Sequence, residues 1–303
     1  MRHLLSPLDF SVEELDSLLD LASDIEKNPD KYKHTCDGKK LATLFYEPST
    51  RTRLSFESAM LSLGGNVLGF ADAGSSSAQK GESVSDTIRI ISCYADICAM
   101  RHPKEGAPLV ASINSGIPVI NAGDGGHQHP TQTLTDLMTI RSLKGRLDTL
   151  TIGLCGDLKF GRTVHSLSNA LCLYDNVKIY LVSPKKLKMP QEVLHDLDKT
   201  NIDYEEVESI EEIIDEVNVL YVTRIQKERF GDINDYLKIK GAYIVNKKML
   251  EGKNAIVMHP LPRIDEIDGD VDDTKYNKYF NQAFNAVPVR MAILKTLIKN
   301  YPK

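Results

Sequence analysis

Short apolar segments alternate with amphipathic segments along nearly the whole chain, and this alternation limits the possible folds more than any other feature. An apolar run of strand length repeatedly ends at a turn that leads into a helical pattern. Parallel strands need such crossovers, because a tight hairpin joins only antiparallel strands. The sequence therefore predicts an α/β protein with two doubly wound parallel-sheet domains joined by interdomain helices. The expected strands cover residues 41–46, 67–70, 96–100, 118–122, 151–155, 177–182, 204–207, 217–222 and 255–258.

The length of the chain indicates how many domains it forms. Its 303 residues suit two domains of about 150 residues each. Residues 144–148 end a long helical pattern and look like a hinge, which divides the chain into domains 1–145 and 146–283. The remaining segment, 284–303, carries the pattern of a last helix.

The composition is ordinary for a globular protein, with 42% hydrophobic and 26% charged residues. The net charge of −5 gives no general attraction to nucleic acid or to an anionic membrane, and no apolar run approaches the length of a membrane span. An anionic ligand must therefore be held by local arginines and lysines. The cysteines are odd in number and contain no Cys-x-x-Cys pair, which is typical of reduced thiols in a cytoplasmic protein.

Three connecting segments carry expectations of their own. Residues 72–83 are small and polar, which predicts an exposed and mobile loop. Residues 210–214 are expected to form a short acidic helix. The acidic stretch 265–273 is expected to be an exposed loop.

The segment Ser49-Thr50-Arg51-Thr52-Arg53 stands between an expected strand and an expected helix. Pro48 ends the strand because it has no N–H to donate, and Ser49 or Thr50 is a natural helix N-cap. A helix start offers unpaired N–H groups at the positive end of the helix dipole, beside which this segment places hydroxyls and a guanidinium. These features indicate a phosphate site. A well-capped helix with two exposed arginines is the alternative that the segment alone leaves open.

Other polar residues follow expected strands at their carboxyl ends, the edge at which open α/β sheets bind ligands. Arg101 ends one strand, with a salt bridge to a helix end as its structural alternative. His129 precedes a helix that opens with proline. Arg162 lies near the start of another helix, where it is well placed to bind a carboxylate. Arg224 and Gln226 follow a further strand.

Two other kinds of site are disfavoured. The loop at 156–163 joins a strand to a helix, but it lacks Gly-x-Gly-x-x-Gly and places Lys159 and Arg162 in the turn, which argues against a dinucleotide. His127 and His129 have no further cysteine or histidine nearby, so no metal site is expected. The turn at 259–263 is different, because two prolines stiffen it and leave its carbonyls to face the amine or amide of a ligand.

Four segments together resemble the transcarbamoylase family, in the family's order and over essentially the whole chain. They are Ser49-Thr50-Arg51-Thr52-Arg53, His129-Pro130-Thr131-Gln132, Asp157-Leu158-Lys159-Phe160-Gly161-Arg162-Thr163 and His259-Pro260-Leu261-Pro262-Arg263. The resemblance implies transfer of the carbamoyl group from carbamoyl phosphate to the amine of L-aspartate, giving N-carbamoyl-L-aspartate and phosphate. It places this reaction in pyrimidine (UMP) biosynthesis and implies no cofactor.

The resemblance also implies a role for each candidate residue. The catalytic residues are Arg51, Thr52, Arg101 and His129. The residues implied to bind carbamoyl phosphate are Ser49, Thr50, Arg51, Thr52, Arg101, His129, Gln132, Leu261 and Pro262. Those implied to bind aspartate are Lys80, Arg162, Arg224 and Gln226, with Ser76 and Lys80 reaching in from the neighbouring chain.

The implied assembly is a cytoplasmic homotrimer in which the helix at 284–303 returns to the first domain. Some members of the family also bind separate zinc-containing regulatory chains, and the sequence leaves both assemblies open.

Two alternative functions are compatible with parts of this pattern. Ornithine carbamoyltransferases have His-Cys-Leu-Pro where this chain has His259-Pro260-Leu261-Pro262, and the cationic side chain of ornithine would meet Arg162 and Arg224 unfavourably. A non-catalytic anion sensor on the same fold would bind phosphate and aspartate without turnover.

Overall fold

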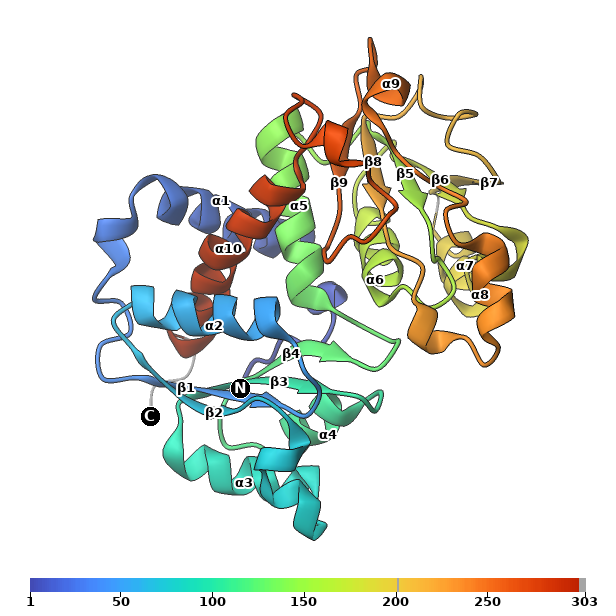
Figure 1. Cartoon of the computed structure of the whole chain (residues 1–303). Coiled ribbons are helices and arrows are strands. Elements are labelled where there is room, and N and C mark those ends of the chain that lie inside the picture. Colours follow the sequence, from blue (N-terminus) through green and yellow to red (C-terminus); the bar gives the residue numbers. More distant parts are fainter. Residues whose placement is uncertain (201, 300–303) are drawn as a thin grey trace. The chain divides into compact units, whose positions relative to one another are not determined.

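The computed structural model describes residues 1–200 and 202–299, and within them the chain forms two compact α/β units (Figure 1). Unit 1 comprises Met1–Met138 and the segment from Phe284 onward, and unit 2 comprises Thr139–Ala283. Two helices, α5 and α10, continue from one unit into the other. Residues 300–303 of the expected last helix lie outside the described residues.

All strands expected from the sequence are present, with small shifts at their ends. The strands are β1 (Lys40–Phe45), β2 (Asn66–Phe70), β3 (Ile97–His102), β4 (Val119–Asp124), β5 (Thr151–Cys155), β6 (Lys178–Val182), β7 (Asp203–Val207), β8 (Val219–Val222) and β9 (Ile256–Met258). The helices are α1 (Val12–Lys27), α2 (Thr50–Ser62), α3 (Val84–Tyr94), α4 (Ala107–Asn114), α5 (Pro130–Lys144), α6 (Arg162–Leu171), α7 (Gln191–Asp198), α8 (Ile233–Ile239), α9 (Lys247–Leu250) and α10 (Tyr279–Lys299). None of the described helices is long and apolar enough to cross a membrane.

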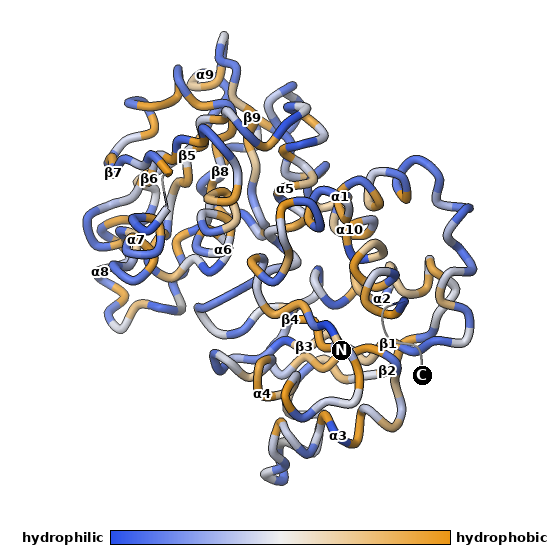
Figure 2. The backbone as a smooth tube through the Cα atoms, turned by 180° about the vertical axis from the view of Figure 1, so that it is seen from behind, coloured by the Kyte–Doolittle hydropathy of each residue, from blue (hydrophilic) through white to orange (hydrophobic). Residues whose placement is uncertain are grey.

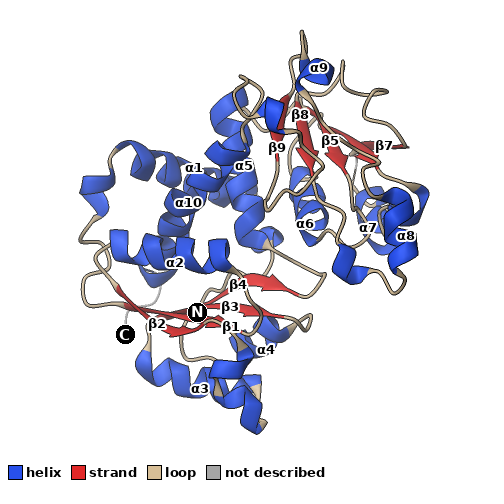
Figure 3. Cartoon of the chain, viewed as in Figure 1, coloured by secondary structure: helices blue, strands red, loops and turns tan. Residues whose placement is uncertain are grey.

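Unit 1 is built on a parallel sheet with strand order β2-β1-β3-β4. Its central strands are almost completely buried, which requires cover on both faces. Helices α3 and α4 cover one face, where Leu44, Ile88, Met100 and Ala111 share a buried cluster. Helix α2 lies over the other face (Figure 3). The predicted doubly wound arrangement is confirmed for this unit.

Unit 2 has a second parallel sheet, with strand order β7-β6-β5-β8-β9. Cys155, Leu220 and Val257 belong to a buried cluster on one face. Neighbouring residues such as Leu154 and Tyr221 are equally buried, and because side chains alternate along a strand, the opposite face is covered as well. Figure 2 shows that hydrophobic stretches coincide with the strands of both sheets, while the outer connecting segments are mostly hydrophilic.

Two expectations about connecting segments are wrong. Residues 210–214 form hydrogen-bonded turns instead of a helix, because this short segment buries its isoleucines and then leads directly into β8. Residues 265–273 are not simply an exposed loop. Glu266, Ile267 and Val271 are buried. Ile267 forms a bridge with Val245, and Ile267 and Val271 both belong to the buried cluster of unit 2.

The loop at 72–83 is largely exposed, as expected, but it contains two short 3-10 turns, Ala73–Ser75 and Ser77–Lys80. Helices α8 and α9 were not predicted from the sequence.

Candidate active site

The candidate residues lie at the point in each parallel sheet where the strand order reverses, so that successive strands are added on the other side. In unit 1, strand β2 lies on one side of β1 and β3 on the other, and in unit 2 the corresponding reversal lies between β5 and β8. Loops diverge at such a point and leave room for a ligand at the carboxyl ends of the strands. The turns after β1, β3 and β4 meet at the edge in unit 1, and those after β5, β8 and β9 meet in unit 2. Each unit therefore carries its own group of candidate residues.

Helix α2 begins at Thr50, with Ser49 as its N-cap residue. Ser49 makes no side-chain capping bond to any residue that the structure describes, so its predicted position is correct but its hydroxyl does not close the helix. Because the ladder of α2 starts with Arg53 N–H donating to Ser49 O at 3.2 Å, the N–H groups of the first turn point out of the helix end. This helix end has the donors that an anion requires.

The two arginines of this segment have different surroundings. The Nε–H of Arg53 donates to Glu57 Oε1 at 2.7 Å, and the Thr43 hydroxyl donates to the same oxygen at 3.1 Å. Arg51 is exposed beside the buried Thr52. The alternative of two exposed arginines is therefore wrong for Arg53, which is tied to its own helix.

Arg101 lies beside the start of α2. It stands opposite Phe45 in the β1–β3 ladder, and Tyr46 N–H donates to its carbonyl at 2.9 Å. Its Nε is 2.8 Å from Glu47 Oε1, and the two side chains are 12% and 26% exposed. Glu47 was missed by the sequence analysis, although its position directly after a strand and before Pro48 was a usable signal.

The loop after β4 brings His129 and Gln132 to the same edge of the sheet. Asp124, at the end of β4, accepts from Gly106 N–H at 2.9 Å and from Gln128 N–H at 3.1 Å, which fixes the loop. His129 is buried just before α5. The Nε2 of Gln132 donates to Asp136 Oδ1 at 2.8 Å, one helical turn further on.

The loop after β2 carries Ser76 and Lys80 at the same carboxyl edge, because β2 is the neighbour of β1. The Ser76 hydroxyl donates to Ala73 O at 2.9 Å, and Lys80 is exposed. The start of α2, Arg101, His129 and Gln132 thus lie at one edge of the sheet in unit 1, and the loop after β2 lies beside them.

In unit 2 the turn after β5 depends on Gly156. Its φ of +116° lies in a region that favours glycine, and a Cβ there would stand 2.2 Å from Thr223 O. This close approach joins the ends of β5 and β8. Asp157 follows Gly156 directly, and α6 then begins at the half-buried Arg162.

Asp157 holds the loop that carries Arg224 and Gln226. Its carboxylate accepts from Phe160 N–H at 3.0 Å and from Gln226 N–H at 3.1 Å. Burial raises the pKa of Asp157, while these N–H donors and the charge of Arg224 oppose that shift. The role of Asp157 could not be predicted from the sequence, because its bond to a residue 69 positions away has no local signal.

The His259–Pro262 turn is held by a buried pair. Leu261 N–H donates to His259 Nδ1 at 2.8 Å, and His259 Nε2 lies 2.7 Å from Glu266 Oε1. Because Nδ1 accepts a hydrogen bond, the ring proton is on Nε2 and is donated to the carboxylate. Leu261 has a φ of 57°, which is uncommon for a leucine, and the Leu261–Pro262 peptide is cis.

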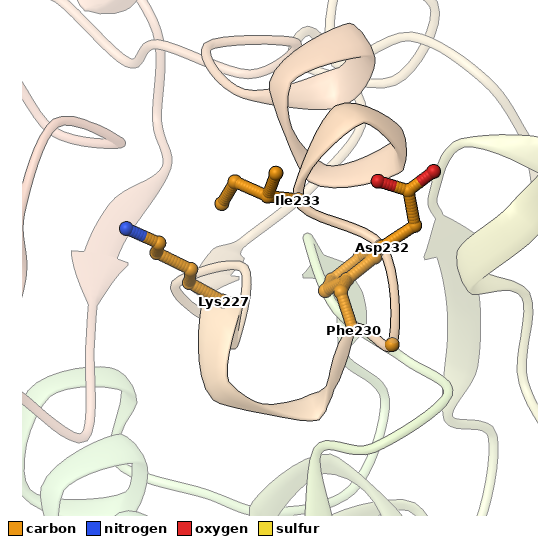
Figure 4. A pocket seen from close by; sticks show the side chains of 5 residues that line it. Lys227, Phe230, Asp232 and Ile233 are labelled. Atoms are coloured by element: carbon orange, nitrogen blue, oxygen red, sulfur yellow. The ribbon is translucent and has the colours of Figure 1, made fainter.

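A shallow hollow follows β8 in unit 2, lined by Lys227, Phe230, Gly231, Asp232 and Ile233 (Figure 4). In the figure, the ammonium group of Lys227 and the carboxylate of Asp232 point away from each other. The hollow therefore does not offer the converging cations that a phosphate or a dicarboxylate needs.

Two family models match the chain. Residues 2–142 match the carbamoyl-phosphate-binding domain of aspartate/ornithine carbamoyltransferases. Residues 148–297 match the aspartate- and ornithine-binding domain of the same family.

Curated relatives are similar over the whole chain. An aspartate carbamoyltransferase catalytic subunit from Methanobrevibacter smithii is 64% identical over 100% of this chain and 96% of its own. A protein of the same description from Lachnoclostridium phytofermentans is 60% identical over 100% of both chains.

Solved structures agree with the sequence relatives. The catalytic subunit of M. jannaschii aspartate transcarbamoylase superposes with a TM-score of 0.93 at 56% identity, covering 99% of both chains. The aspartate transcarbamoylase of Trypanosoma cruzi, in complex with N-(phosphonacetyl)-L-aspartic acid, gives a TM-score of 0.91 at 37% identity over 98% of this chain and 95% of that one.

The buried pair beneath the His259–Pro262 turn predicts a pH dependence of stability. Burial lowers the pKa of His259 below its ordinary value of 6.5, although Glu266 opposes the shift. Burial acts to raise the pKa of Glu266, but the bond from His259 and backbone donors outweigh it, so that pKa is lowered. As pH falls below about 6.5, the unfolded chain takes up a proton at His259 that the folded protein does not, and stability decreases. Thermal unfolding midpoints measured between pH 7 and 5 should fall.

The contribution of His259 is isolated by comparison with two variants. His259→Gln should show a shallower decrease, while His195→Gln, which changes an exposed histidine on α7, should keep the wild-type slope. Parallel profiles for the wild type and His259→Gln would contradict the assignment of a neutral ring.

Proposed function

The chain belongs to the aspartate/ornithine carbamoyltransferase family and transfers a carbamoyl group from carbamoyl phosphate to L-aspartate in pyrimidine biosynthesis, and we propose that its residues divide this reaction between its two units. Residues 1–145, with the last helix, would form the carbamoyl-phosphate-binding domain, and residues 146–283 the aspartate-binding domain. The descriptions of the two matching family models support this division.

The start of α2 binds the phosphate in this proposal. Ser49, Thr50, Arg51 and Thr52 combine hydroxyls, a guanidinium and the N–H groups of a first helical turn. A phosphate dianion is stabilised by such donors and by the helix dipole. The exposure of Arg51 and the closed Arg53–Glu57 pair support Arg51 as the phosphate ligand of the two.

The carbonyl oxygen of carbamoyl phosphate is assigned to residues at the same edge of unit 1. Arg101, His129 and Thr52 stabilise the negative charge that develops on the carbonyl oxygen, because donors fixed in advance are most effective for such charge. Gln132 binds the carbamoyl amide. The backbone carbonyls of Leu261 and Pro262 accept from its NH2 group, and the unusual φ of Leu261 supports a constrained turn at this position.

Arg162, Arg224 and Gln226 are proposed to bind the carboxylates of aspartate. Asp157 supports this role because it fixes the Gln226 backbone and lies close enough to Arg224 for their charges to interact. A pair of arginines favours a dicarboxylate over the cationic side chain of ornithine.

No covalent intermediate is needed for this reaction. Phosphate is a good leaving group, so the amine of aspartate attacks the carbonyl carbon and a tetrahedral oxyanion forms. The C–O bond to phosphate then breaks, and the departing phosphate takes the proton that the amine loses. The protein contributes charge neutralisation and the positioning of the two substrates.

The observation that carries the proposal is that each sheet has cationic and polar candidate residues where its strand order reverses, in a chain whose residues 2–142 and 148–297 match the two family models. A radiolabelled carbamoyl-transfer assay with aspartate and ornithine offered in parallel tests it. Aspartate should be carbamoylated and ornithine should not. Equal transfer to both acceptors, or binding without turnover, would refute the proposal.

Replacing Arg224 should affect the two substrates differently. Arg224→Ala should raise the KM for aspartate about 10-fold or more, the scale of a lost charge-assisted hydrogen bond, with a much smaller effect on the KM for carbamoyl phosphate. Steady-state kinetics in each substrate measure this. The matched control is Arg229→Ala, an exposed arginine on the same loop, which should behave like the wild type. Equal changes in both KM values would show that Arg224 does not select the acceptor.

The proposed assembly is a cytoplasmic homotrimer, alone or with separate zinc-containing regulatory chains. The exposed loop with Ser76 and Lys80 supports a site completed in trans, because a threefold ring presents the same loop of each chain to the next. The free cysteines Cys36, Cys93, Cys98, Cys155 and Cys172 support a reducing compartment.

A site shared between chains predicts complementation. Lys80→Ala and Arg51→Ala should each be nearly inactive. When the two variants are dissociated, mixed in equal amounts and reassembled, about three trimers in four are mixed, and each has one site with both wild-type residues. Roughly a quarter of the wild-type activity should return.

The matched control mixes Arg51→Ala with Arg101→Ala. Both residues belong to the same unit of one chain, so no hybrid site regains both and the mixture should remain inactive. If the Lys80→Ala mixture also remains inactive after subunit exchange has been confirmed, Lys80 does not act in trans.

A further inference from the structure

Helix α10 carries a buried arginine into unit 1. Arg290 is 1% exposed, and burial lowers its pKa to about 10, with the charge of Asp136 acting in the opposite direction. Its Nη1 donates to Ala286 O at 3.0 Å, and its guanidinium lies 4.9 Å from the centre of the Phe56 ring on α2. The cation therefore stands among α10, α2 and α5, as Figure 1 shows for these helices.

Asp136 is the anion that acts on Arg290, and it is fully buried on α5. Its Oδ1 accepts from Gln132 Nε2 at 2.8 Å. Gln132 is the one residue between His129 and Ile140, a stretch described in full, that is not buried. The amide of Gln132 therefore lies between a buried carboxylate and the open edge of the sheet.

We propose that the buried Asp136 is a positioning residue that fixes the Gln132 amide with its oxygen free to accept from the carbamoyl NH2 group, and so makes the site select carbamoyl phosphate over acyl phosphates. The proposal rests on the assignment of Gln132 to the carbamoyl amide in the proposed function.

The hydrogen-bonding properties of the groups support this role. A carboxylate only accepts, so the amide must turn its NH2 end toward Asp136, and its oxygen remains for another donor. In acetyl phosphate, a methyl group replaces the carbamoyl NH2 and has no proton to donate. With the Gln132 amide turned the other way, its NH2 group would face the NH2 group of carbamoyl phosphate. The carbamoyl NH2 would then lose the amide oxygen as its hydrogen-bond acceptor.

Asp136→Asn tests the proposal because the new side chain can donate as well as accept, so the orientation of Gln132 is no longer fixed. The measured quantity is selectivity, defined as the inhibition constant of acetyl phosphate divided by the KM of carbamoyl phosphate. Selectivity should fall about 10-fold or more, through a higher KM for carbamoyl phosphate. The inhibition constant of acetyl phosphate should change little. A purely structural role would weaken both ligands alike and leave the selectivity unchanged, which would overturn the proposal.

Gln132→Met separates the inference from the function on which it rests. This variant should lower selectivity on its own, and adding Asp136→Asn to it should produce no further change. If Gln132→Met keeps wild-type selectivity, the assignment of Gln132 is wrong and the inference is overturned with it. If Gln132→Met lowers selectivity and Asp136→Asn does not, only the inference is wrong.

Two further variants guard against an effect of misfolding. Asp96→Asn makes the same chemical change at the opposite end of β3, where Asp96 accepts from Lys40 N–H at 2.9 Å, and it should keep wild-type selectivity. The double variant Asp136→Leu/Arg290→Met replaces the whole buried pair by apolar side chains, a change that proteins often tolerate. It should fold, as circular dichroism can show, and have low selectivity. Wild-type selectivity in the folded double variant would overturn the proposal.

Discussion

Both groups of candidate residues depend on one constraint, which is that parallel strands direct all their carboxyl ends to the same edge of a sheet. In each unit the strand order reverses once at the centre of that edge, between β1 and β3 and between β5 and β8. The loops on either side of the reversal run in opposite directions, so backbone N–H groups and long side chains remain accessible there. The start of α2 and Arg101 use this opening in unit 1, and the turn at Gly156 and the Arg224 loop use it in unit 2.

Buried carboxylates hold the loops at these edges in place. Asp124 in unit 1 and Asp157 and Glu266 in unit 2 each accept hydrogen bonds from backbone N–H groups, within their own loop or from a neighbouring one. A hydrogen bond to a charged group contributes about 1.5–3 kcal/mol, and leaving a buried charge without its partner costs about 3–5 kcal/mol. A loop conformation that removed these donors would leave the buried carboxylate without partners. The free-energy cost of that loss therefore favours one loop conformation over the others. Functional cations such as Arg224 can then stay close to solvent, because other groups fix their backbone.

The local parts of this design could be predicted from the sequence, and the long-range parts could not. Strand positions, the start of α2 and the polar residues after each strand follow from apolar patterns, proline and capping residues. The burial of Glu266, Ile267 and Val271 was missed, because it depends on distant segments such as Val245, which bridges to Ile267, and composition alone indicates exposure for an acidic stretch. The role of Glu266 depends on His259, and that of Asp157 on Gln226, which is 69 residues away. The exposure of Arg53 could not be judged from its segment either, because it depends on the bond of Arg53 to Glu57, whose carboxylate also accepts from Thr43 of β1.

The distribution of charge explains why so many carboxylates stand near the candidate cations. The chain as a whole carries −5, so its long-range field repels a dianionic phosphate. At physiological ionic strength, screening confines such forces to about 8 Å, and recognition must come from groups in direct contact. In the absence of ligand, a guanidinium in a half-buried edge would be costly, and a nearby carboxylate reduces that cost. Glu47 beside Arg101 and Asp157 near Arg224 provide such compensation, and an anionic ligand must compete with them. Because that competition lowers the affinity for any single anion, selective binding requires several donors at each of these sheet edges.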